Sequence, residues 1–297
     1  MRIVSPLLEG LSSGIARRID DLSSTPSFVR QASRIGHELP GHEADPIVIV
    51  PGLTADAWMY RRGTEMLREE GFDVTAMHMP WHGWNGIPGD AKQLRETVER
   101  AIDRAQKSGR DIDRVQLVGD SEGGLISRQF LQFEGGNQLV SRLITNGTPH
   151  NGIRPFASDA VAAGVQRLRA MPAGVRDLLT SSPVMHRLNG DWSDFLVRAR
   201  AADPAFTAHS IASRVFGANT DGLVPVAAAR LAGDAPVVNN YLTTGAHSIN
   251  FAFGKRQTEA GHVLLGVLGS GDTHAQASME RARAAAAQAA AGVGELR

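Results

Sequence analysis

Two pentapeptides in the chain match the pattern Gly-x-Ser-x-Gly, which can place a serine hydroxyl in a tight turn between a strand and a helix. They are Gly10–Gly14 and Gly119–Gly123, with Ser12 and Ser121 at their centres. Ser121 follows the apolar run Val115–Val118 and precedes a segment whose apolar residues recur at helical spacing. Because the turn needs a buried strand before it and a helix after it, the sequence predicts Ser121 as a nucleophile and Ser12 as a loop or helix residue.

A nucleophilic serine needs a histidine that takes its proton and an acid that orients this histidine. Asp221 lies in a loop after the apolar run Ala212–Gly217, and His247 lies in a loop after the run Val237–Leu242. Because functional loops gather at the carboxyl ends of parallel strands, the sequence predicts Asp221 as the acid and His247 as the base. The simpler interpretations are an Asx turn before Gly222 for the aspartate, and a loop histidine bonded to the backbone.

Other residues fit these two roles less well. His262 lies within a helical pattern, and His274 lies in the C-terminal tail. Asp120 is the neighbour of Ser121 along the chain, so its carboxylate cannot also reach the far side of the imidazole ring. His247 therefore remains the predicted base.

Acyl transfer to a serine also needs hydrogen-bond donors aimed at the oxygen that becomes negatively charged. One donor is the backbone N–H of the residue after the nucleophile, Glu122, and a second comes from a loop after an early strand. The run Ile47–Val50 is followed by Pro51-Gly52-Leu53. The sequence predicts the N–H groups of Leu53 and Glu122 as this oxyanion site, with a plain turn as the alternative.

The elements that hold these residues follow a regular alternation. From residue 46, short apolar runs alternate with segments of helical periodicity. Strands that are apolar on both faces and separated by helices indicate an α/β fold with a mostly parallel sheet flanked by helices. Residues 151–203 show no strand pattern, and Pro155, Pro172 and Pro183 interrupt their helical stretches, one of which is expected over Trp192–Ala201.

Four regions follow from this pattern. We expect an α/β core over residues 46–150 and 204–270, with a helical cap or lid inserted at residues 151–203. Residues 1–45 are expected to form a helical extension, and residues 271–297 an Ala-rich tail. Both terminal segments are candidates for packing across the sheet edge or for forming a homo-oligomer.

The composition excludes several classes of protein. The 297 residues contain no cysteine, which excludes a cysteine nucleophile and thiolate metal sites. The 31 basic residues balance the 31 acidic ones, so the charge gives no footprint for nucleic acid. No apolar run approaches the roughly 20 residues of a membrane span. The N-terminal apolar residues are too interrupted for a secretion signal, which favours the cytoplasm over export.

Six short segments, in this order and spacing, resemble the bacterial lipases and esterases of the α/β-hydrolase superfamily. The resemblance implies an α/β-hydrolase fold with a lid insertion, a catalytic triad of Ser121, Asp221 and His247, and ester hydrolysis through an acyl-enzyme. The segments are Val50–Leu53, Met79–Gly83, Gly119–Gly124, Thr145–Gly152, Asp221–Pro225 and Gly245–His247. The fourth of them closes a strand and opens the lid in that family.

The chain departs from these relatives at two places. Many of them have His or Tyr where Asp120 precedes the serine, and a carboxylate there is expected to raise the pKa of His247 by through-space attraction. Calcium-binding relatives carry an aspartate shortly after the catalytic histidine, whereas His247 is followed by Ser248, Ile249 and Asn250. No structural calcium is therefore expected. No other metal-ligand spacing occurs in the sequence, and we expect no cofactor.

Apolar side chains near the predicted site indicate the class of substrate. Trp58 and Trp81 lie in loops near the site, and Met185 lies in the predicted cap. We expect them to line an apolar pocket under a mobile lid, although ordinary cap packing would also explain them. A small-molecule or lipid ester with an apolar acyl chain is the expected substrate. Thioester hydrolysis or acyl transfer would use the same residues, and a catalytically silent binding protein of this fold is the alternative from another class.

Overall fold

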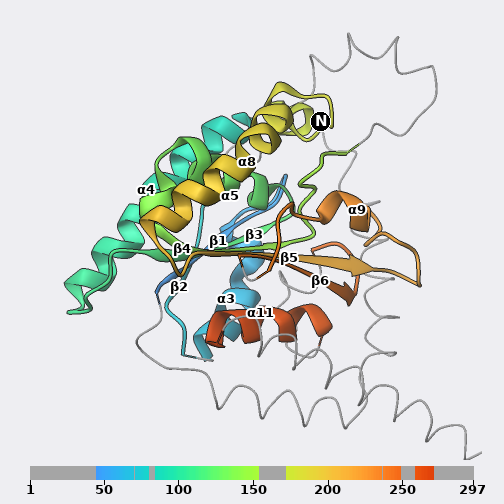
Figure 1. Ribbon diagram of the computed structural model, residues 1–297. Helices are drawn as coiled ribbons and strands as arrows, with labels where there is room; N and C mark the ends of the chain where they lie inside the picture. The colour runs from blue at the N-terminus through green and yellow to red at the C-terminus, as the bar shows by residue number, and fades with distance from the viewer. Residues whose placement is uncertain are drawn as a thin grey trace, which may run out of the picture.

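The computed structural model describes residues 45–69, 71–79, 84–153, 172–235, 237–248 and 258–270 of the chain. Figure 1 draws these residues in colour. Several sequence predictions lie outside the described residues, namely the N-terminal extension with Ser12, the tail from residue 271, and Trp81.

The described strands form one six-stranded sheet in the order β2-β1-β3-β4-β5-β6, and every neighbouring pair is parallel. β1 and β3 are buried along their whole length. Burial on both faces explains why these strands read as continuous apolar runs rather than as an alternating pattern. The strands are β1 (Ile47–Val50), β2 (Val74–Ala76), β3 (Val115–Asp120), β4 (Val140–Asn146), β5 (Thr207–Arg214) and β6 (Val238–Thr244).

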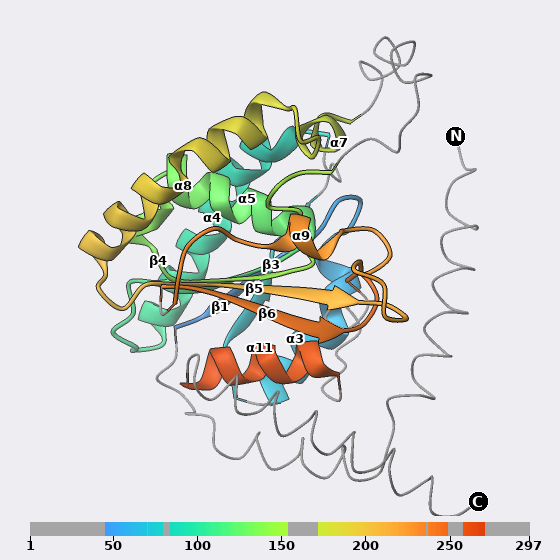
Figure 2. The same ribbon diagram turned by 45° about the vertical axis from the view of Figure 1, so that its right-hand side comes forward.

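Helices cover both faces of this sheet, as Figures 1 and 2 show from two directions. Val48 and Val50 of β1 pack in the hydrophobic cluster that contains α4, α5 and α8. Ile47 and Ile49 point to the opposite face and pack with α3 and α11. The predicted fold class, a mostly parallel sheet flanked by helices, is confirmed. The covering helices are α3 (Arg61–Glu69), α4 (Gly86–Lys107), α5 (Glu122–Phe133), α8 (Pro183–Ala202) and α11 (Glu259–Ser270), and the shorter ones are η2 (Ala57–Tyr60), η3 (Gly136–Gln138), α7 (Ala173–Asp177) and α9 (Val226–Ala229).

The strand order brings the loops after β1 and β3 side by side. The chain runs from β1 outward to β2 and then returns to the other side of β1 to form β3. After β1 and the short helix η2, the chain forms α3 on one face of the sheet, whereas α5, after β3, covers the other face. Such a reversal opens a crevice at the carboxyl ends of the two strands, which is where open α/β sheets bind ligands.

One helix begins earlier than the sequence pattern predicts. The helix expected over Trp192–Ala201 starts at Pro183. Ser182 caps it, because its hydroxyl oxygen accepts a hydrogen bond of 3.1 Å from the N–H of Met185. The N–H groups in the first turn of a helix have no partner within the helix, so the N–H that proline lacks is not needed there. Pro183 therefore begins the helix instead of interrupting it. The prediction that this proline breaks the helical pattern is wrong.

The buried face of α8 belongs to the main core. Leu188 and Trp192 are buried in the same hydrophobic cluster as α5. From α5, the side chains of Arg128 and Gln132 donate hydrogen bonds of 2.7 and 2.9 Å to the carbonyl oxygen of Leu188. This part of the predicted cap is therefore tied to the layer that covers the sheet. Residues 154–171 lie outside the described residues, and a mobile lid stays a prediction.

Candidate active site

Ser121 occupies a tight turn between the end of β3 and the start of α5. Its φ of 52° and ψ of −122° lie in a region that residues with a side chain rarely adopt. A Cβ atom on Gly119 would lie 2.5 Å from the Cα of Gly124. A Cβ on Gly123 would lie 2.0 Å from the carbonyl oxygen of Val50. The glycines of the pentapeptide are thus required by close contacts between β1, β3 and α5.

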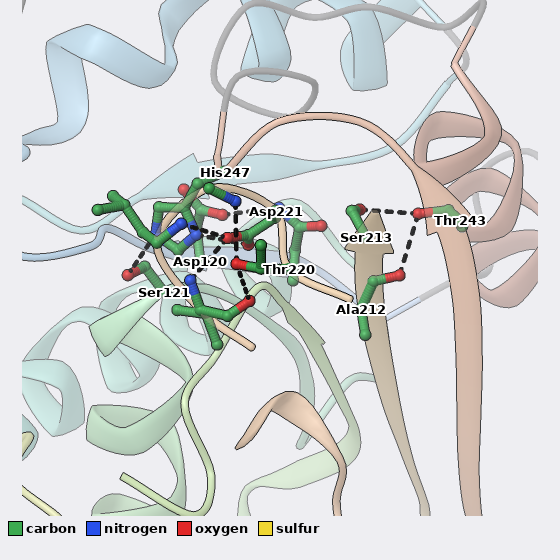
Figure 3. A network of polar contacts seen from close by, with 12 residues as sticks. Asp120, Ser121, Ala212, Ser213, Thr220, Asp221, Thr243 and His247 are labelled. Atoms are coloured by element: carbon green, nitrogen blue, oxygen red, sulfur yellow. Dashed lines mark hydrogen bonds and ion pairs between the residues drawn. The ribbon is translucent and has the colours of Figure 1, made fainter. Parts of the chain in front are cut away.

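Three side chains predicted from the sequence meet at the carboxyl edge of the sheet, as Figure 3 shows. His247 Nε2 lies 2.9 Å from Ser121 Oγ. On the other side of the ring, His247 Nδ1 lies 2.7 Å from Asp221 Oδ2. Ser121 follows β3, Asp221 lies in the loop after β5, and His247 lies in the loop after β6. When Nδ1 carries the proton donated to the carboxylate, Nε2 is left to accept the serine proton.

Asp221 is fixed by its own loop. Its Oδ1 accepts hydrogen bonds of 2.9 and 2.7 Å from the N–H groups of Leu223 and Val224. The Asx turn considered as the simpler interpretation therefore forms, and it leaves Oδ2 for His247. The N–H of His247 also donates to the carbonyl oxygen of Asp221 at 2.9 Å. A Cβ on Gly147 would lie 3.1 Å from both Asp221 Oδ2 and His247 Nδ1, so glycine leaves room for this pair.

Opposing effects set the pKa of His247. Burial lowers the pKa, whereas the hydrogen bond and charge of Asp221, together with the charge of Asp120, raise it, and the net pKa lies above the ordinary histidine value. The contribution of Asp120 has the sign expected from the sequence. The neutral imidazole, which can accept the serine proton, is therefore the main form only at pH values above this raised pKa.

The loop after β1 lies directly against the serine. A Cβ on Gly52 would lie 3.0 Å from the Cβ of Ser121 and 3.7 Å from its Oγ, which leaves little room for a side chain. Within the described ranges, the N–H groups of Leu53 and Glu122 have no hydrogen-bond acceptor. Unpaired backbone donors in the two residues that adjoin this contact are the arrangement an oxyanion site needs.

The carboxylate of Asp120 binds Tyr60 and Asn146 and is not the acid partner of His247. Its Oδ2 accepts a hydrogen bond of 2.7 Å from the hydroxyl of Tyr60, and its Oδ1 accepts one of 2.8 Å from the side-chain amide of Asn146. Tyr60 and Asn146 were not predicted as residues of this site. Neither shows a local signal, because Tyr60 lies in a helical pattern and Asn146 ends a strand, and only the folded sheet brings both to Asp120.

The side chain of Glu122 is buried, and among the described residues neither of its carboxyl oxygens has a hydrogen-bond partner. Burial, with the nearby charges of Asp90 on α4 and Asp177 on α7, raises the pKa of Glu122 to about 8. The carboxyl group therefore holds a proton at neutral pH. From the sequence, only the backbone N–H of Glu122 was predicted to have a role. Its place at the start of a helix, directly after a strand of apolar residues, is the signal that indicates burial of its side chain.

The predicted substrate-binding residues lie in different environments. Trp58 is 72% exposed in η2. Met185 is 1% exposed and packs in the core cluster under α8, so its burial is explained by ordinary packing. Trp81 lies outside the described residues. Trp84, in the loop after β2, and Leu223, in the loop after β5, are 56% and 57% exposed. Exposed apolar side chains therefore follow the ends of β1, β2 and β5.

The described residues contain no group of three or more histidine, aspartate and glutamate side chains arranged to hold a metal ion. Asp90, Glu122 and Asp177 are close enough for charge to shift a pKa, but they do not form such a group. In the same part of the chain, no helix is long and apolar enough to cross a membrane.

Comparison with known sequences places the chain in a family. Residues 45–206 match the family model described as alpha/beta hydrolase fold, which is more than half of the 297 residues. The chain therefore belongs to the α/β-hydrolase family. This match confirms the family and the fold to which the six sequence segments pointed. No curated protein sequence matches the chain.

Solved structures of lipases share this fold. The mature form of lipase BlEst2 from Bacillus licheniformis is 21% identical with a TM-score of 0.53, and the match covers 77% of this chain and 94% of that chain. Phospholipase PlaB from Legionella pneumophila, in complex with thio-NAD, is 14% identical with a TM-score of 0.58. That match covers 82% of this chain and 62% of the phospholipase. At these identities the likeness establishes the fold alone.

Proposed function

We propose that the protein is a serine ester hydrolase of the lipase or carboxylesterase type, with Ser121 as nucleophile, His247 as base and Asp221 as the acid that orients it. One observation carries the proposal, namely the continuous hydrogen-bonded chain from Ser121 Oγ through both imidazole nitrogens to Asp221 Oδ2. The lipase and phospholipase names of the structural relatives support esters as the substrate class.

The reaction follows from these positions. Ser121 Oγ attacks the ester carbonyl carbon while its proton passes to His247 Nε2, and the imidazolium is stabilised by Asp221. The carbonyl oxygen becomes negative and is held by the N–H groups of Leu53 and Glu122. The tetrahedral intermediate collapses, the proton on His247 leaves with the alcohol, and an acyl-enzyme remains. Water attacks this acyl-enzyme with the same base, which releases the acid and restores Ser121.

An ester with an apolar acyl chain is the substrate we propose. The exposed side chains of Trp58, Trp84 and Leu223 support this, because each follows a strand, and all strands of the parallel sheet end at the edge that carries Ser121. Exposed apolar groups beside a site favour an apolar ligand. Thioester hydrolysis and transfer of the acyl group to an alcohol would use the same residues and differ in the leaving group or the acceptor.

Hydrolysis of a series of p-nitrophenyl esters tests this function. The wild type and the control variant Ser108→Ala, which alters an exposed serine on the end of α4, should both turn over esters with long acyl chains. Ser121→Ala should lose activity by at least about a thousandfold. Turnover of acetate and butyrate esters alone would refute the apolar-chain assignment. Absence of any turnover by the wild type would favour a binding protein instead.

A further inference from the structure

A buried chain of polar groups lies behind the serine and has no part in the triad. Asp120 is fully buried and accepts hydrogen bonds from the Tyr60 hydroxyl at 2.7 Å and from the Asn146 side chain at 2.8 Å. A buried carboxylate is costly unless it is paired in this way. Two donors from different elements, η2 and the end of β4, therefore converge on the residue that precedes Ser121.

Tyr60 extends this chain to the loop after β1. Its hydroxyl oxygen accepts a hydrogen bond of 3.2 Å from the N–H of Gly52. Burial and the neighbouring carboxylate of Asp120 raise the pKa of Tyr60 well above its usual value, so the phenol keeps its proton. With that proton donated to Asp120, the lone pairs of the phenol oxygen are directed to other donors, and Gly52 supplies one.

Asn146 links Asp120 to the backbone of Ser121. Its side chain donates to Asp120, and its backbone carbonyl oxygen accepts the N–H of Ser121 at 2.8 Å. The loop containing Gly52 and the turn containing Ser121 are thus held by groups that share one carboxylate.

The contact between these two loops is tight. A Cβ on Gly52 would already lie 3.0 Å from the Cβ of Ser121. Leu53 follows Gly52 directly in the chain, so a small movement of Gly52 would also move the Leu53 N–H relative to the serine. Oxyanion donors act only when they are placed within hydrogen-bond distance of the developing charge, so this placement affects the rate.

We infer that Tyr60 and Asp120 are positioning residues for the oxyanion loop. Asp120 orients the phenol of Tyr60, and the phenol holds the Gly52 N–H and so places the Leu53 N–H beside Ser121. This inference rests on the proposed ester hydrolysis. It goes further by assigning a role to the acidic residue before the serine and to one of the two tyrosines of the chain.

The variant Tyr60→Phe tests this inference, because it removes one hydroxyl and leaves the charge of Asp120 in place. The chain offers a matched control in Tyr241→Phe, since Tyr241 is the other tyrosine and lies buried on β6, with its hydroxyl 3.4 Å from His209 Nδ1. Both variants lose one buried hydroxyl. A role confined to stability would lower the Tm of both and leave kcat unchanged.

The measurements are kcat, KM and Tm with a p-nitrophenyl ester. Tyr60→Phe should lower kcat by about tenfold or more with KM changed by less than about twofold, because the oxyanion donors act in the transition state. Tyr241→Phe should keep the wild-type kcat. A Tyr60→Phe variant with wild-type kcat, or with its whole loss in KM, would overturn the inference while leaving the proposed function intact.

Asp120→Asn provides a second route if Tyr60→Phe does not fold. The amide keeps the size of the side chain but offers one acceptor oxygen to the two donors, Tyr60 and Asn146. We expect the same selective loss in kcat, and a wild-type maximal kcat in this variant would contradict the inference. Failure of the proposed function has a different signature, because the wild type itself would then neither hydrolyse esters nor react with a fluorophosphonate, and the inference would fall with it.

Discussion

Single side chains at the carboxyl edge of the sheet account for the proposed chemistry. The imidazole of His247 is bound at both nitrogens, to Asp221 and to Ser121, and so has one orientation. The residues before and after the serine in the chain, Asp120 and Glu122, also carry carboxyl groups, and both are buried. Within the described part of the chain, the Asp120 carboxylate accepts hydrogen bonds from Tyr60 and Asn146, whereas the Glu122 carboxyl group accepts none. Each of these two carboxyl groups leads to a prediction about pH.

Asp120→Asn should shift the acidic limb of the pH–rate profile to lower pH. The charge of Asp120 helps to raise the pKa of His247, so its removal lowers that pKa and makes the neutral imidazole available at lower pH. The measurement is kcat/KM against pH for wild type and variant. The position of the limb is independent of its height, so a loss in kcat does not obscure the shift. An acidic limb at an unchanged pH would refute the electrostatic role of Asp120.

Glu122→Gln should become more stable than the wild type as the pH rises. The pKa of Glu122 is raised from 4.5 to about 8, so between these values the folded state holds a proton that the unfolded state has released. The wild type therefore loses stability as the pH rises through this window, and glutamine, which cannot ionise, removes the loss. Tm measured across the window should show a growing gap in favour of the variant.

Glu96→Gln is the matched control for this comparison, because Glu96 is exposed on α4 and forms at most a surface pair with Arg100. Its Tm should follow the wild type at every pH, since surface pairs contribute little. A gap between Glu122→Gln and wild type that stays constant from acid to alkaline pH would show that the Glu122 carboxyl does not hold the proton.

Contacts between strands and helices hold the turn at Ser121 and the helix α8 in place. The turn at Ser121 exists because β1, β3 and α5 approach within contact distance of one another, and three glycines allow that approach. α8 is held on α5 by core packing and by hydrogen bonds to the carbonyl oxygen of Leu188. The guanidinium of Arg128 also lies 4.6 Å from the centroid of the Trp192 ring. These contacts fix α8 against α5, the helix that begins directly after Ser121.

Gly123→Ala tests the role of the turn, with Gly190→Ala as the control on α8. A Cβ at position 123 would lie 2.0 Å from the carbonyl oxygen of Val50, whereas a Cβ at position 190 would have no atom of the described residues within 4 Å. Gly123→Ala should destabilise the fold by about 2 kcal/mol or more and abolish ester hydrolysis. Gly190→Ala should raise stability by up to about 1 kcal/mol, since alanine favours a helix interior. Thermal unfolding and hydrolysis rates check both, and an active, fully stable Gly123→Ala would contradict the packing argument.

Over the whole molecule, the sequence predicts what depends on local pattern and chain order. The strand Ile47–Val50 has the predicted ends, because an unbroken apolar run marks it, and the segment of helical spacing after Ser121 forms α5. β5 begins at Thr207, earlier than predicted, since its buried polar residues hide the strand pattern. Their polar atoms are paired instead, as in the hydrogen bond of 2.6 Å from Ser210 to the carbonyl oxygen of Ala229.

In the candidate site, too, the residues that a local sequence pattern marks could be predicted and the others could not. Ser121, Asp221 and His247 could be predicted because each follows a strand, and strand ends meet at one edge. Tyr60 and Asn146 could not be, because their partner, Asp120, is defined by the register of β3 and β4 and by the position of η2, which no local pattern contains.

The site of covalent modification by a fluorophosphonate tests the central claim most directly. After labelling, mass spectrometry of peptides from the wild type should locate one adduct on Ser121. His247→Gln should label about a thousandfold more slowly, because the serine loses its base. Ser121→Ala should carry no adduct. An adduct on a different serine, or labelling of Ser121→Ala at the wild-type rate, would contradict the assignment of the nucleophile.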